Sequence, residues 1–189
     1  MKRALLLIIV MGATLLLACG VALAATSTRC AAGACWGTSG PDDMTGTPSN
    51  DVLFGRGSSD AISALAGDDA PFGASGPDAI HAAEGNDAVF PGGGNDLVFG
   101  DEGNDLIADF SGSDAVHGGR GNDLIYARDG EPDSIHCGGG DDAVYYDAGV
   151  DSVNSGGCEL ASTSFWDALK VRFQIGEILR GILSWRPSK

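Results

Sequence analysis

The chain has 189 residues, of which 30 are Gly, and 11 Lys and Arg stand against 26 Asp and Glu, giving a formal net charge of -15. Such an acidic chain repels phosphate groups, which argues against nucleic acid as a partner. The glycine content is unusually high for a single domain.

Residues 1–24 have the pattern of a secretory signal peptide. A basic start precedes a long apolar run that ends in small residues, and the sequence fits cleavage after Ala24. Lipid attachment at Cys19 is the alternative, and an uncleaved anchor is a third possibility. We therefore expect a secreted, extracellular protein.

Cysteine usage is consistent with export, because four cysteines remain after cleavage and an even number favours two disulfides. The simplest pairing joins sequence neighbours, Cys30 with Cys35 and Cys137 with Cys158. A zinc site is the alternative, but it would require C-x-x-C spacings that neither pair has. Residues 25–36, which contain the first pair, are predicted to form an N-terminal cap loop.

Residues 37–158 are built on a period of nine residues. Each repeat has an Asp, an aliphatic residue two positions later and, in most repeats, a Gly two positions earlier. The interval between Asp123 and Asp133 is ten residues instead of nine, and Pro71 is the one departure from the aliphatic pattern. The repeated aspartates are Asp42, Asp51, Asp60, Asp69, Asp78, Asp87, Asp96, Asp105, Asp114, Asp123, Asp133, Asp142 and Asp151.

This period fits a tight glycine turn followed by a strand of three residues. Side chains alternate along a strand, so the aliphatic residue points inward and its two neighbours point outward. One repeat covers one side of a coil, and two repeats complete a coil of 18 residues. The predicted fold class is all-β, a flattened parallel solenoid with two sheets in which repeats two apart stack.

The repeat resembles the nonapeptide G-G-x-G-x-D-x-U-x of the RTX, or haemolysin-type, calcium-binding family. The closest repeats are PGGGNDLVF (91–99), GDEGNDLIA (100–108), GGRGNDLIY (118–126) and CGGGDDAVY (137–145). The resemblance implies a right-handed parallel β-roll that binds several Ca²⁺ ions between repeats two apart, through Asp carboxylates and the carbonyls of the glycine turns.

The ligands implied by the resemblance are Asp87, Asp96, Asp105, Asp114, Asp123 and Asp142 with Gly85, Gly92, Gly94, Gly103, Gly112, Gly119, Gly121, Gly138 and Gly140. The pairs implied to share an ion are Asp87 with Asp105, Asp105 with Asp123, Asp96 with Asp114, and Asp123 with Asp142. The first four repeats lack the second Gly, so the alternative there is Asp as a turn residue without metal.

Charge gives an independent reason to expect cations. Carboxylates stacked about 4.8 Å apart repel by roughly 0.9 kcal/mol in water and by about 3.5 kcal/mol at an effective dielectric constant near 20. Ca²⁺ relieves this repulsion and suits carboxylate and carbonyl oxygens better than Mg²⁺, which requires strict octahedral geometry.

One outer face of the solenoid is predicted to carry a ladder of aromatic residues. A contiguous apolar face of this size is rarely exposed in a soluble monomer, so we expect something to cover it. Within residues 159–189, the predicted C-terminal cap, residues 162–185 form an amphipathic helix about 32 Å long that matches the length of the ladder. Docking there is one prediction, and the Lys and Arg residues of the helix support a membrane surface or protein partner as the alternative.

The sequence contains no nucleophile elbow, phosphate loop or H-E-x-x-H motif, so we expect a protein that is not an enzyme. His81, His117 and His136 fall on the other outer face, where a metal or acid–base site is conceivable, but a solvent-facing role on exposed strands is the simpler interpretation. The predicted function is that of a monomeric calcium-binding module with a structural or interaction role. A membrane-active or adhesive protein that uses its cationic tail is the alternative.

Overall fold

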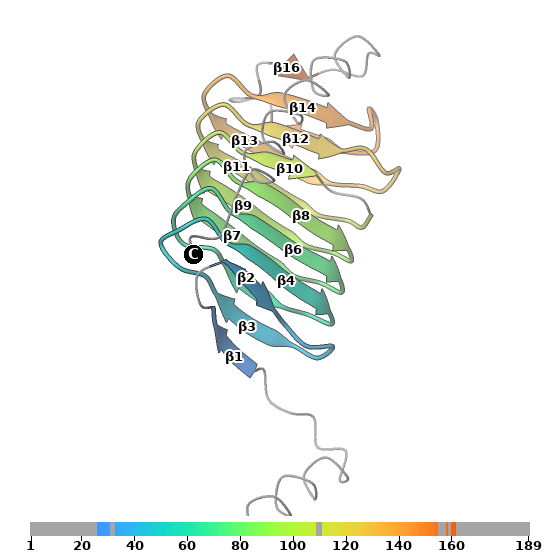
Figure 1. Cartoon of the computed structure of the whole chain (residues 1–189). Helices are drawn as coiled ribbons and strands as arrows, with labels where there is room; N and C mark the ends of the chain where they lie inside the picture. Colours follow the sequence, from blue (N-terminus) through green and yellow to red (C-terminus); the bar gives the residue numbers. More distant parts are fainter. Residues whose placement is uncertain (1–25, 31–32, 109–110, 155–157, 159, 162–189) are drawn as a thin grey trace, which may run out of the picture.

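The computed structural model describes residues 26–30, 33–108, 111–154, 158 and 160–161. In these residues, strands form two parallel eight-stranded sheets, and there is no helix. Figure 1 shows the coils stacked along one axis, from β1 at one end to β16 at the other. The predicted parallel solenoid with two sheets is confirmed, whereas the predicted helix at 162–185 lies outside the described residues.

The chain alternates between the two sheets at every strand. The odd sheet consists of β1 (Thr26–Arg29), β3 (Asp42–Thr45), β5 (Ala61–Ser63), β7 (Ala79–Glu84), β9 (Leu97–Glu102), β11 (Ala115–Arg120), β13 (Ser134–Gly139) and β15 (Ser152–Asn154). The even sheet consists of β2 (Ala34–Trp36), β4 (Val52–Gly57), β6 (Ala70–Ser75), β8 (Ala88–Gly93), β10 (Leu106–Ala108), β12 (Leu124–Ala127), β14 (Ala143–Tyr146) and β16 (Leu160–Ala161).

The strand register reproduces the repeat of the sequence. Ile107 of β10 lies beside Ile125 of β12, 18 positions later. Ala115 of β11 lies beside Ser134 of β13, 19 positions later, because the extra residue falls between Asp123 and Asp133. The insertion lengthens one turn, and both sheets continue in register beyond it.

A single column of aliphatic side chains from each sheet fills the interior. Alternation along the short strands points one residue of every three inward, and successive coils bring these residues into contact. The buried column consists of Met44, Leu53, Ile62, Ile80, Val89, Val98, Ile107, Val116, Ile125, Ile135 and Val144. The core is therefore long and narrow, and each coil depends on its neighbours for burial.

The solenoid begins earlier than the sequence predicts. Residues 25–36 were expected to form a cap loop, but β1 and β2 lie in this segment and pair with β3 and β4. Cys35 is buried beside Leu53 in the aliphatic column, and its disulfide to Cys30 closes the first coil. The reason is that Gly33 takes the place of the repeated Asp, which preserves the backbone path while hiding the repeat.

The other end also extends beyond its predicted limit. Cys158 is bonded to Cys137, which is fully buried, and the two Cα atoms are 5.3 Å apart. Beyond this disulfide, β16 pairs in parallel with β14, so residues 160–161 continue the even sheet instead of starting a separate cap. Both predicted disulfides are present.

Both outer faces carry stacked rings. On the even sheet the ring centroids of Trp36 and Phe54 are 4.1 Å apart, and the stack continues through Phe72 to Phe90. Near the other end of the same face, Leu106, Leu124 and Tyr145 form a second apolar cluster that is almost completely buried.

Candidate metal centre in the turns

Two columns of aspartates run along opposite edges of the roll, where the chain passes from one sheet to the other. The odd column, at the starts of odd strands, consists of Asp42, Asp60, Asp78, Asp96, Asp114, Asp133 and Asp151. The even column, just before even strands, consists of Asp51, Asp69, Asp87, Asp105, Asp123 and Asp142. All except Asp151 are at most 3% exposed.

One oxygen of each carboxylate links two coils. The backbone N–H of Asp87 donates to Oδ1 of Asp105 at 2.8 Å, and the N–H of Asp105 donates to Oδ1 of Asp123 at 3.0 Å. The same bond joins Asp96 to Asp114 and Asp123 to Asp142. The four ligand pairs predicted from the sequence are therefore brought together one coil apart.

The second oxygen has no hydrogen-bond partner in most of the column. An uncompensated buried carboxylate oxygen costs several kcal/mol, so it indicates a missing ligand. The unpartnered Oδ2 atoms belong to Asp60, Asp69, Asp78, Asp87, Asp96, Asp105, Asp114, Asp123, Asp133 and Asp142. All six predicted ligand aspartates are in this set, together with Asp60 and Asp69, which the sequence left open, and Asp78 and Asp133, which were not among the predicted ligands.

Several of these oxygens lie beside a glycine. A Cβ built on Gly100 would lie 2.6 Å from Oδ2 of Asp105 and 2.3 Å from the carbonyl oxygen of Gly118. The same arrangement recurs at Gly118, where the two atoms are Oδ2 of Asp123 and the carbonyl oxygen of Cys137. A carboxylate oxygen and a carbonyl oxygen of the next coil therefore converge on one glycine and form a cradle in which a side chain would clash with both.

Burial shifts the titration of these carboxylates upward. Desolvation raises the pKa of Asp105 to about 8, partly opposed by the hydrogen bond from the backbone of Asp87. Desolvation likewise raises the pKa of Asp123 to about 6 and that of Asp87 to about 7. Further values are about 8 for Asp69, about 7 for Asp78 and Asp133, and about 6 for Asp96. The ionised columns are thus unfavourable in the folded chain without a cation.

The predicted turn glycines lie where the backbone takes a positive φ. These are Gly85, Gly92, Gly94, Gly103, Gly112, Gly119, Gly121, Gly138 and Gly140. At Gly103 a Cβ would come within 1.5 Å of the Gly85 carbonyl oxygen, so the turn admits no side chain. In the third to sixth repeats, residues other than Gly take the same left-handed conformation at the second position, namely Arg56, Leu65, Ala74 and Ala83.

The donor set is chemically specific. Among the described residues, no three His, Cys, Asp or Glu side chains converge as a metal-binding group. An ion in the turns would therefore combine the carboxylates with backbone carbonyls. Oxygen-only ligands in a flexible glycine turn suit Ca²⁺, which accepts six to eight such ligands.

Comparison with known families decides the assignment. The family model for the RTX calcium-binding nonapeptide repeat matches residues 36–70, 72–107, 109–131 and 132–153. The chain belongs to this family. A search of curated proteins finds no match to the chain. The turns described above are thus RTX turns, and the family supports a calcium-binding structural module.

The outer face of the odd sheet is a different kind of surface in this RTX roll. The rings of His81, Phe99, His117 and His136 stack in sequence, with centroids 4.4 to 4.9 Å apart. The Phe99 ring lies between those of His81 and His117, so the face predicted to carry the three histidines also carries an aromatic residue. Burial and the neighbouring His136 lower the pKa of His117, although Asp101 opposes this.

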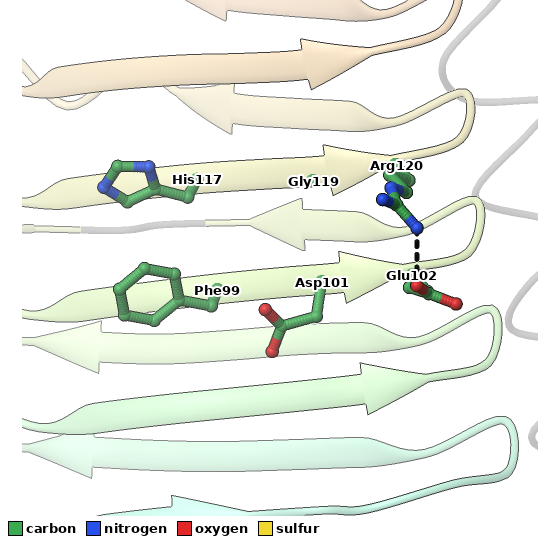
Figure 2. Close-up of a pocket in the computed structure, with 6 residues that line it drawn as sticks. All are labelled: Phe99, Asp101, Glu102, His117, Gly119 and Arg120. Carbon is green, nitrogen blue, oxygen red and sulfur yellow. Dashed lines mark hydrogen bonds and ion pairs between the residues drawn. The ribbon is translucent and has the colours of Figure 1, made fainter.

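Charged residues flank the stack. Phe99 and His117 line a shallow cavity of about 270 Å³, and Figure 2 shows the two rings on strands of the same sheet. Arg120 pairs with Glu102 at 2.9 Å, and Nδ1 of His81 lies 3.2 Å from Asp101. These polar side chains thus contact one another, which is consistent with a solvent-facing surface.

Within the described residues, no helix has the length and apolar character needed to cross a membrane. The predicted signal peptide and residues 162–185 lie outside the described residues.

Proposed function

We propose that this chain is a secreted β-roll that requires calcium for full stability and acts as a structural or interaction module without enzymatic activity. The observation that carries the proposal is the buried, unpartnered Oδ2 atom in ten consecutive coil-linking aspartates. Several of these atoms lie against a glycine where a side chain would clash, and family membership supports calcium as the ion.

The electrostatic balance explains why calcium would control folding. In the folded chain without an ion, burial raises the pKa of a carboxylate such as Asp105, and the carboxylates of the adjacent coils, Asp87 and Asp123, raise it further. If each site has a Kd of about 0.1 mM, then about 1 mM calcium stabilises the fold by about 1.4 kcal/mol per site. Several sites acting together would decide whether the central coils are folded.

The residues have separate roles in this scheme. The Oδ1 atom of each aspartate holds the preceding coil through a backbone N–H, while Oδ2 and the nearby carbonyls are left to hold Ca²⁺. Bound calcium would supply positive charge where the columns concentrate negative charge. Glycines such as Gly100 and Gly118 keep the cradle free of side-chain atoms.

Calcium titration tests the proposal. Circular dichroism should show β-structure increasing with calcium, and calorimetry should show several bound ions. Magnesium at the same concentration is the control and should have a much smaller effect. No change in β-signal or melting temperature with calcium would refute the proposed function.

A further inference from the structure

The first two aspartate turns differ from those that follow. Oδ2 of Asp51 accepts hydrogen bonds from the backbone N–H of Thr47 at 2.6 Å and from its hydroxyl at 2.8 Å. Oδ1 of Asp51 accepts from the N–H of Gly33 at 2.8 Å. Both oxygens of this buried carboxylate are therefore satisfied by the protein itself.

Asp42 repeats the arrangement on the opposite edge of the roll. Its Oδ2 accepts from the N–H of Thr38 at 2.5 Å and from the Thr38 hydroxyl at 3.1 Å. Thr38 and Thr47 each stand four residues before their aspartate, at the second position of the nonapeptide. A hydroxyl at this position reaches the carboxylate across the turn.

The next turn on each edge lacks such a donor. Arg56 and Leu65 occupy the second position before Asp60 and Asp69, and Oδ2 of each aspartate is unpartnered. The change from satisfied to unsatisfied carboxylate therefore coincides with the change of residue at the second position. It occurs at the same coil on both edges.

We propose that Thr38 and Thr47 replace calcium in the first two turns, so that the N-terminal coils fold without the ion and form a base for the calcium-dependent coils. The proposal rests on the proposed function, since it assumes that the later turns hold calcium. The disulfide between Cys30 and Cys35 closes the same end of the roll.

The junction between the two regions supports stepwise stacking. The backbone N–H groups of Asp42 and Asp51 donate to Oδ1 of Asp60 and Asp69, respectively. A folded N-terminal end thus presents two correctly placed donors to the first aspartates that lack a second partner. Each later coil then offers the same donors to the next.

Hydrogen exchange of the full-length, disulfide-intact protein tests the proposal. In the presence of a calcium chelator, amides in residues 33–57 should exchange at least roughly tenfold more slowly than those in residues 97–127. In calcium, both regions should be protected. Equally fast exchange of the two regions without calcium would overturn the proposal.

A pair of isosteric variants identifies the donor. In chelator, Thr47→Val should reduce protection of residues 33–57 by roughly tenfold, because it removes one hydrogen bond to a buried carboxylate. Thr45→Val is the matched control, since Thr45 lies at the end of β3 with its side chain toward the outer face. Equal effects of the two variants would refute the role of Thr47, and if Thr47→Val does not fold, the wild-type exchange pattern still decides.

The two proposals fail in distinguishable ways. Wild-type protein that binds no calcium in calorimetry would contradict the proposed function itself. Wild-type protein that binds calcium but requires it to protect residues 33–57 would contradict only the replacement of calcium by threonine.

Discussion

Replacing Gly100 with Ala tests whether Oδ2 of Asp105 holds an ion. The new Cβ would lie 2.3 Å from the Gly118 carbonyl oxygen and 2.6 Å from Oδ2 of Asp105, so it would occupy the cradle. Gly139→Ala is the matched control, because a Cβ there meets no atom within 4 Å. Neither glycine has a positive φ, so the comparison isolates the effect of space.

The expected loss has two parts. Forcing a methyl group into a filled site costs about 1 to 3 kcal/mol. Loss of one ion removes about 1.4 kcal/mol more at about 1 mM calcium, for a Kd of about 0.1 mM. A total of about 2 to 4 kcal/mol corresponds to a decrease in Tm of about 5 to 15 °C for a chain of this size.

Calorimetry and thermal melting provide the assay. Gly100→Ala should bind at least one calcium ion fewer than wild type, and its loss of Tm should be larger in calcium than in chelator. Gly139→Ala should keep the wild-type stoichiometry and change stability by less than about 0.5 kcal/mol. If Gly100→Ala retained every bound ion, the cradle would not be a calcium site and the reasoning would be wrong.

Three further predictions follow from the same columns and from the ends of the roll. Burial raises the folded-state pKa of several aspartates to about 6 to 8, so the stability that their protonation gives the calcium-free fold is fully present below the unfolded pKa near 3.8 and is lost as the pH rises through the raised values. Circular dichroism in chelator should therefore show more β-structure at pH 5 than at pH 8. The opposite order would contradict the assigned shifts. Asp105→Asn keeps an acceptor for the N–H of Asp87 but removes a buried charge. At pH 9, the Tm of this variant should therefore be higher than that of wild type in chelator and lower than that of wild type in calcium. Thermal melts check this, with Asp43→Asn as the control because the Asp43 side chain is exposed. Deleting residues 162–189 should increase the fluorescence of a dye that binds apolar surface, because Leu106, Leu124 and Tyr145 lie on the outer face yet are buried; unchanged fluorescence would show that this segment does not cover them.

The spacing of nine residues was sufficient to predict most of the fold. An Asp and an inward aliphatic residue recur in every predicted repeat except at Pro71, and a side chain period of two allows only one of three strand residues to point inward. The pairing of coils 18 residues apart and the shift at the extra residue follow from this pattern.

The first coil escaped prediction because its signal is in the backbone. Gly33 has no carboxylate, yet its N–H donates to Asp51 and its carbonyl accepts from Val52. Cys35 lies 18 positions before Leu53 and was in phase with the aliphatic column, but it was interpreted only as a disulfide partner.

The candidate site was predicted in outline but not in its limits. The sequence identified the aspartates and glycines, and it left calcium in the early repeats open because they lack the second Gly. Thr38 and Thr47 stand where the second Gly is missing from the first two repeats, and each contributes a hydroxyl donor to the carboxylate. That distinction depends on which oxygen faces the turn, and a residue pattern alone does not contain it.

The difference between the period of the sequence and the period of the structure bears on how such a chain tolerates changes in length. Removing 18 residues from the middle would take out one coil and leave every later strand in its own sheet. Removing nine residues before Phe99 would preserve the repeat of the sequence but transfer every later strand to the opposite sheet. Phe99 would then move to the even sheet and Tyr126 to the odd sheet. Cys137 and Cys158 would still move together, because both follow the deletion. Viable insertions and deletions should therefore occur in whole coils.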